Sequence, residues 1–116
     1  MNYNKIFLII LVFLLLIPIP LNAAEVLQVR SATLLEIGDQ NRNYQVKIGC
    51  INIDSARESE VRTWLKSQLP RKTRVNFRPL SAEDGVLIAR VIPLGNENDL
   101  TSQMIAKGYG LGTCNN

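Results

Sequence analysis

Apolar and polar residues alternate along several short segments of this chain, as they do in β-strands with one buried face. The clearest alternation runs over residues 44–51, where Gly49 indicates a bend or a close approach of neighbouring chain. Four further runs are rich in aliphatic and β-branched residues and are bounded by polar turn clusters: residues 26–29, 33–37, 75–78 and 86–92. We therefore expect five strands, with residues 80–85 forming the turn before the last one.

A helix is predicted between the third and fourth strands. Ser55, followed three residues later by Glu58, is typical of a capping box, so we expect the helix to begin at Ser55. Pro70 ends it, because proline lacks the amide that helix continuation requires. The apolar stripe that packs on the core has helical spacing and consists of Val61, Trp64, Leu65 and Leu69.

A second, shorter helix is predicted after the fifth strand. Asp99 is its expected N-cap and Gly108 suits its C′ position. Its apolar face consists of Leu100, Met104 and Ile105. The element order is then β-β-β-α-β-β-α, which predicts an α+β fold that is mainly β: a five-stranded barrel of the OB type with two helices.

The N-terminus has the organisation of a secretory signal peptide. A short basic segment precedes an unbroken apolar run over residues 6–17, and a stretch of small residues ends at Ala23 and Ala24. The run is shorter than the roughly 20 apolar residues of a spanning helix. We therefore expect residues 1–24 to be a signal peptide cleaved after Ala23 or Ala24, leaving residues 25–116 as an exported periplasmic or extracellular domain. An uncleaved membrane anchor is the alternative.

Composition narrows the chemistry available to the exported part. The chain of 116 residues has a formal net charge of +3 and contains no histidine, which excludes His-dependent acid–base catalysis, nucleophilic triads and His-ligated zinc. Its two cysteines, Cys50 and Cys114, both follow the signal peptide. In an oxidising compartment such a pair indicates a disulfide rather than a metal site. An enzyme built on this chain would rely on carboxylates, cations or a hard metal ion.

Three segments carry a resemblance to a known family. Residues 46–52 read VKIGCIN, residues 84–91 read DGVLIARV, and residues 104–110 read MIAKGYG. In this order they resemble the V-R-L-x-x-I-D, Y-G-R-x-L-A-x-V and L-V-x-x-G-x-A motifs of the thermonuclease (staphylococcal-nuclease-like) family. The resemblance spans nearly all of residues 26–114 and implies the same OB-type barrel, here expected without the family's third, C-terminal helix.

Members of that family are calcium-dependent phosphodiesterases, and the resemblance implies where their catalytic groups would lie. Two aspartates hold the metal, a glutamate assists the attacking water, and two arginines stabilise the phosphate. The matching positions carry Ala32 and Asn52 for the aspartates, Ser55 for the glutamate, and Lys47 and Val86 for the arginines. Losing one such group typically lowers the catalytic rate about 10²–10³-fold. Because all five positions differ, we expect this chain to have no catalytic residues, no metal and no cofactor.

A nuclease remains the alternative function. Shifting the alignment by one residue would place Asp54 at a metal-ligand position, but it would disturb the strand alternation and the helix cap at Ser55. We therefore prefer the unshifted alignment. In the alternative, Asp39, Asp54 or Glu83 would act in rearranged roles, and only then is calcium expected as a cofactor.

Without catalytic groups, the chain is expected to act as a binding module for nucleic acid or for a protein partner, with no stable membrane association after signal cleavage. The candidate binding residues are cations expected to point outward and one tyrosine: Lys66, Arg71, Lys72, Arg74, Arg78, Arg90 and Tyr44. Single-strand binders also use stacking aromatics, for which only Tyr44 and Tyr109 look available. A merely solvated surface is the competing interpretation, and a structural role in an envelope assembly is a further alternative.

The resemblance also implies which cysteines pair. In relatives the segment after the second helix runs beside the third strand, which would place Cys114 near Cys50. We therefore expect a Cys50–Cys114 disulfide. Closing so long a loop would stabilise the domain by about 4 kcal/mol in the chain-entropy model.

Overall fold

The computed structural model describes residues 24–114. The predicted signal peptide lies outside these residues except for Ala24. In chain order the elements are β1 (Ala24–Val29), β2 (Leu34–Asp39), β3 (Arg42–Ile48), β4 (Ile51–Ile53), the 3₁₀ turn η1 (Ser55–Arg57), α2 (Glu58–Gln68), β5 (Thr73–Glu83), β6 (Val86–Pro93), α3 (Leu100–Ala106) and β7 (Gly110–Gly112). Within residues 24–114, no helix is long and apolar enough to cross a bilayer.

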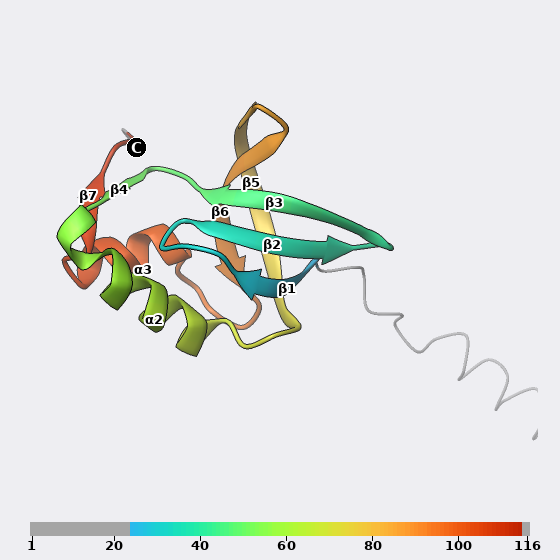
Figure 1. Ribbon diagram of the computed structural model, residues 1–116, viewed down its shortest axis with the longest axis horizontal. Coiled ribbons are helices and arrows are strands. Elements are labelled where there is room, and N and C mark those ends of the chain that lie inside the picture. The colour runs from blue at the N-terminus through green and yellow to red at the C-terminus, as the bar shows by residue number, and fades with distance from the viewer. Residues whose placement is uncertain (1–23, 115–116) are drawn as a thin grey trace, which may run out of the picture.

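Five strands close into a barrel in the order β1-β2-β3-β6-β5 (Figure 1). Neighbouring strands are antiparallel except for β3 and β6, which run parallel. β4 and β7 form a separate two-stranded sheet, which lies with α2 and α3 at one end of the barrel. The predicted fold is confirmed: it is mainly β, with an OB-type five-stranded barrel and two α-helices in the expected order.

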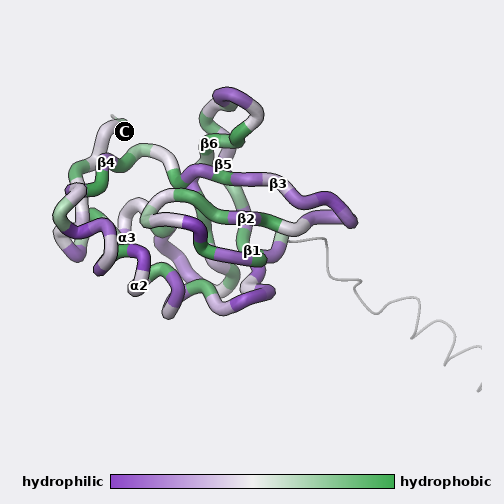
Figure 2. The backbone as a smooth tube through the Cα atoms, in the orientation of Figure 1, coloured by the Kyte–Doolittle hydropathy of each residue, from purple (hydrophilic) through white to green (hydrophobic). Residues whose placement is uncertain are grey.

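The hydrophobic core fills the barrel and continues under the two helices. Its fully buried side chains include Val26, Leu35, Ile37, Val46, Ile48, Val61, Leu65, Val75, Val91, Leu100 and Met104. Burying each such side chain contributes about 1.5–3 kcal/mol. Trp64 packs against this core from its margin, as predicted. Figure 2 shows the complementary pattern, with hydrophilic residues at the tips of the β2–β3 and β5–β6 hairpins.

The turn predicted over residues 80–85 is much shorter in the structure. β5 continues to Glu83, and only Asp84 and Gly85 turn the chain, both with positive φ, +51° and +78°. Positive φ at both central residues is the geometry of a tight hairpin, and Asp-Gly is a preferred sequence for it. A register shift between Pro79 and Ser81 lets β5 stay paired with β6 up to this turn. The turn therefore occupies only the last part of the predicted range, because Asp84 and Gly85 alone reverse the chain.

The strand predicted over residues 44–51 is broken near its end. β3 stops at Ile48, and the chain bends at Gly49 and Cys50 before β4 begins. A side chain at residue 49 would meet Leu80 Cδ1 at 2.7 Å and Ile88 Cγ2 at 3.0 Å. The predicted role of Gly49 at a close approach is therefore confirmed, and the bend turns the chain from the barrel into the β4–β7 sheet.

The first helix does not begin as predicted. Asp54, not Ser55, is the N-cap: its carboxylate accepts the N–H of Ala56 at 3.0 Å and starts the 3₁₀ turn η1. α2 itself starts only at Glu58. Glu58 makes no capping box with Ser55, because its carboxylate instead accepts a hydrogen bond from the N–H of Ala32. The cap therefore gives no support to the unshifted alignment over the shifted one.

The second helix follows the prediction closely. Asp99 Oδ1 accepts the N–H of Ser102 at 2.7 Å, which confirms Asp99 as the N-cap of α3. Gly108 has φ +75°, and the N–H of Tyr109 reaches back to the carbonyl of Met104, as in a Schellman ending. Ile105 departs from the prediction, because its side chain is 41% exposed instead of facing the core.

Cys50 and Cys114 form the disulfide that the resemblance implied. Their Cα atoms lie 4.9 Å apart although 64 residues separate them in sequence. The N–H of Thr113 also donates to the carbonyl of Cys50, at 3.0 Å. The chain after β7 is thus fastened to the bend between β3 and β4. A disulfide fits the oxidising environment that an exported protein meets.

Candidate functional site

The loop between β1 and β2, residues 30–33, is held in place by its own polar groups. The hydroxyl of Ser31 accepts hydrogen bonds from the N–H groups of Thr33 and Leu34, at 3.2 and 3.1 Å. The N–H groups of Arg30 and Ser31 both donate to the carbonyl of Leu34. These hydrogen bonds hold the loop in one compact conformation.

Ala32 lies in this loop, at the position where the resemblance places a metal-binding aspartate, and it is fully buried. Its N–H donates a hydrogen bond to Oε1 of Glu58, the first residue of α2, at a distance of 3.0 Å. This hydrogen bond ties the loop to the helix and brings one carboxylate to the loop. A buried methyl group offers no oxygen to a hard cation. Sequence reasoning missed this contact, because the two residues are 26 positions apart and neither is unusual locally.

The other four positions that the resemblance assigns lie on β3, β4, η1 and β6. Lys47 is exposed near the end of β3, where it faces Leu34 across the β2–β3 pair. Asn52 is exposed on β4, and Ser55 is exposed in η1. Val86 starts β6, on the hairpin that projects beyond the barrel in Figure 1. None of these side chains is a carboxylate or an arginine, the groups that the resemblance assigns to phosphodiester hydrolysis.

The carboxylates considered for a rearranged nuclease are not brought together. Asp39 ends β2, Asp54 caps η1, and Glu83 ends β5 on a different hairpin (Figure 1). Within the residues that the structure describes, no group of three or more acidic, cysteine or histidine side chains could hold a metal ion.

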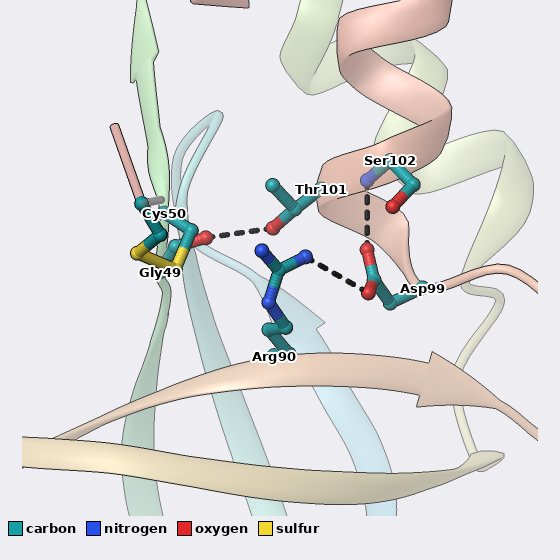
Figure 3. The surroundings of a disulfide bond; sticks show 7 residues. Gly49, Cys50, Arg90, Asp99, Thr101 and Ser102 are labelled. Carbon is teal, nitrogen blue, oxygen red and sulfur yellow. Dashed lines mark hydrogen bonds and ion pairs between the residues drawn. A yellow bond between two sulfur atoms is a disulfide. The ribbon is translucent and has the colours of Figure 1, made fainter. Parts of the chain in front are cut away.

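Arg90 was expected to point outward as a binding cation, and this expectation is wrong. Its residue is only 8% exposed, and its Nη1 lies 3.0 Å from Oδ2 of Asp99, the N-cap of α3 (Figure 3). Strand alternation does direct Arg90 out of the barrel. The helix α3 then covers that outer face, so the guanidinium is enclosed between β6 and α3 and unavailable to a partner.

The ion pair belongs to a small buried polar network. Asp99 accepts hydrogen bonds from both Arg90 and Ser102, and Thr101 Oγ1 donates to the carbonyl of Gly49 at 2.7 Å (Figure 3). Burial alone would raise the pKa of Asp99, but the Ser102 hydrogen bonds and the Arg90 guanidinium outweigh it and lower that pKa below its ordinary value. The network therefore stabilises α3 on the barrel and is structural.

Four of the candidate binding cations follow one another along β5 and the loop before it. We call Arg71, Lys72, Arg74 and Arg78 the basic strip; all four are exposed, and Lys66 is exposed nearby in sequence on α2. Within residues 24–114, the salt bridges are Arg30–Glu36, Arg57–Glu60 and Arg90–Asp99. The basic strip takes part in none of them, so its charges are available to a partner.

The aromatic side chains do not accompany these cations. Tyr109 is only 9% exposed, stacks edge-on against Trp64 at 5.6 Å, and lies under the guanidinium of Arg57, so its expected availability is wrong. Tyr44 is half-buried on β3; burial and the neighbouring Asp39 carboxylate both raise its pKa. Among the residues described, no aromatic residue is exposed. A stacking platform for bases is therefore not present beside the basic strip.

A groove of about 500 Å³ between the β4–β7 sheet and α3 was not anticipated from the sequence. Its lining residues are Asn52, Ile53, Asp54, Ile105, Gly108, Gly110, Leu111 and Gly112. Leu111 is 76% exposed, because the glycines on either side of it provide no side chains to cover it. The groove presents apolar surface beside Asn52, a position that the resemblance assigns to a metal ligand.

A scan against protein-family models finds no match for this chain, and a search of curated proteins finds no significant relative. The thermonuclease resemblance therefore stays a prediction from the three sequence segments and their order.

Proposed function

We propose that this protein is an exported binding module that has an OB-type barrel, lacks phosphodiesterase activity, and contacts an anionic partner through the basic strip. The lack of catalysis is supported by the replaced family positions, above all by Ala32, whose buried methyl group occupies the place of a metal ligand. Export is supported by the sequence of residues 1–24 and by the Cys50–Cys114 disulfide.

The observation that carries the binding proposal is that the basic strip is exposed and takes part in none of the salt bridges among residues 24–114. Arg74 and Arg78 lie four residues apart on β5, on the outer surface of the barrel, since Val75 between them is buried. Arg78 pairs across β5 and β6 with Arg90, whose own charge is paired with Asp99 under α3. An unneutralised row of cations lowers the free energy of an approaching polyanion and releases its counterions on binding.

The experiment has two parts. Purified mature protein is incubated with single-stranded DNA in calcium or in chelator, and no hydrolysis is expected in either. Calcium-dependent turnover that is abolished by Asp54→Ala would overturn the non-catalytic part of the proposal.

The second part measures the salt concentration that elutes the protein from a heparin column. The double variant Arg74→Gln/Arg78→Gln should elute at clearly lower salt than the wild type. The matched control, Arg62→Gln/Lys107→Gln, removes two exposed charges from α2 and from the end of α3 and should elute near the wild type. Equal shifts in the two variants would contradict a role for the basic strip.

A further inference from the structure

Three members of the basic strip lie where the N-terminal chain joins the barrel. β1 begins at Ala24, which pairs with Val75 of β5, and the next pair is Glu25 with Arg74. The N–H of Lys72 donates to the carbonyl of Val26 at 2.7 Å. Arg71 Nη1 reaches the carbonyl of Leu27, at 3.4 Å. We call Arg71, Lys72 and Arg74 the junction cluster.

The predicted signal sequence before β1 would bring this end of the domain close to a membrane. The apolar run over residues 6–17 stops seven positions before Ala24. Seven residue steps span at most about 25 Å when fully extended. While that run is in a bilayer, during export or in an uncleaved chain, the junction cluster is therefore held within about that distance of the headgroups.

The local charge is positive at this end of β5. Glu25 is the acidic residue that faces the cluster, and it is half-buried opposite Arg74 without forming a salt bridge among the residues described. Leu94 adds an apolar side chain here: it is 48% exposed, and its N–H donates to the carbonyl of Arg74 at 3.0 Å. Cations beside an exposed aliphatic side chain match a lipid surface, which offers anionic headgroups above an apolar interior.

The same residues fit nucleic acid less well. Single-strand binders hold bases on exposed aromatic rings, and no such ring is exposed among residues 24–114. Lipid headgroups require only charge and access to the apolar interface.

We infer that the junction cluster, Arg71, Lys72 and Arg74, contacts the headgroups of anionic lipids, so that the domain rests on the membrane surface with this end of β5 towards the bilayer. The inference rests on the proposed function and names the partner of part of the basic strip. Each basic residue at an anionic surface strengthens binding about fivefold. Three of them give reversible contact, consistent with the expectation that the exported domain has no stable membrane association.

The test uses the protein comprising residues 24–116, which contains the complete barrel and its disulfide. Binding is measured by vesicle flotation with phosphatidylcholine alone and with phosphatidylcholine mixed with phosphatidylglycerol. We expect binding to the anionic vesicles only, and we expect high salt to reverse it. Equal binding to both kinds of vesicle, or to neither, would overturn the inference.

The variant Arg71→Gln/Lys72→Gln/Arg74→Gln should bind the anionic vesicles at least tenfold more weakly. The control Lys47→Gln/Arg62→Gln/Lys107→Gln removes the same net charge from β3, α2 and the end of α3, and it should bind within about twofold of the wild type. Equal losses in both would mean that net charge, rather than the cluster, governs binding. Should the triple variant fold poorly, Lys72→Gln/Arg74→Gln, which leaves the Arg71–Leu27 hydrogen bond in place, serves instead.

Heparin binding separates the two proposals. If the protein is retained on heparin but does not bind anionic vesicles, the proposed contact with lipid headgroups is refuted and the proposed binding module is not. A protein that binds neither would refute both. Tight binding to single-stranded DNA, with weak vesicle binding, would assign the basic strip to nucleic acid instead.

Discussion

The backbone N–H of Ala32 donates a hydrogen bond to the side-chain carboxylate of Glu58, 3.0 Å away. The bond joins the β1–β2 loop to the first residue of α2 and leaves the Ala32 methyl group fully buried. The thermonuclease resemblance assigns a calcium-binding carboxylate to this loop. In this protein the N–H of Ala32 in that loop is instead hydrogen-bonded to a carboxylate from the helix.

The substitution Ala32→Asp should not recreate a metal site but should destabilise the protein. The new carboxylate would be buried beside Glu58, so the free energy of unfolding should fall by about 3 kcal/mol or more. Urea unfolding measures the loss, with exposed Lys47→Ala as the control expected to change little. If calcium restored the stability of Ala32→Asp, the loop would still be able to hold a metal.

The substitution Asp99→Asn should cost about 3 kcal/mol of unfolding free energy. Asparagine still caps α3 through its side-chain oxygen, but it leaves the nearly buried Arg90 without a counter-charge. Glu60→Gln is the matched control, because it breaks the exposed Arg57–Glu60 pair and should cost less than about 0.5 kcal/mol. Similar losses in both variants, compared by urea unfolding, would show that burial of the Arg90 pair contributes nothing.

The same pair should make stability depend on pH in the acid range. The pKa of Asp99 is below its ordinary value of 3.8, since hydrogen bonds from Ser102 and Arg90 outweigh the effect of burial, so folding favours the ionised form. This stabilisation is complete above pH 3.8 and is lost as the pH falls through the lower pKa of the folded state. The stability difference between the wild type and Asp99→Asn should therefore shrink from about pH 7 to about pH 3. A constant difference would argue against this titration.

Removal of the disulfide should lower the free energy of unfolding by about 4 kcal/mol in the chain-entropy model, because 64 residues separate Cys50 from Cys114. The double variant Cys50→Ala/Cys114→Ala can be compared with the wild type by urea unfolding, with and without reductant. The reductant should affect only the wild type. Two reactive thiols found by labelling the unreduced, unfolded protein would contradict the pairing itself.

Two glycines of β7 should respond very differently to alanine. A Cβ at residue 110 would collide with the carbonyl oxygen of Asn52 on β4, which is backbone and cannot move aside, so Gly110→Ala should cost about 1–3 kcal/mol. A Cβ at residue 112 would meet only Cδ1 of Ile105 at 3.1 Å, the end of a flexible and partly exposed side chain. Gly112→Ala should therefore be nearly neutral in the same thermal unfolding assay. Equal effects would place β4 and β7 further apart than the structure does.

The candidate site was only partly predictable. The sequence alone shows that the positions assigned by the resemblance carry neither carboxylates nor arginines, because this depends only on which residue occupies each position. The exposure of Arg74 and Arg78 was also predictable, since they alternate with Val75 and Phe77 along one strand. The burial of Arg90 and Tyr109 was not, because in each case the covering group comes from another element: α3 for Arg90, and α2 and η1 for Tyr109.

By itself, the sequence determined the five barrel strands, the two helices and their order, because alternation and helical spacing are local patterns and closing a barrel satisfies every strand edge. Only the tertiary structure decided which outward residues stay in water. In the folded protein the carboxylate of Glu58 accepts a hydrogen bond from the N–H of Ala32, and α3 covers Arg90. Leu111 lies beside an open groove. Burial and ion pairing depend on what packs against a residue, and that neighbour is set by the whole fold rather than by adjacent sequence.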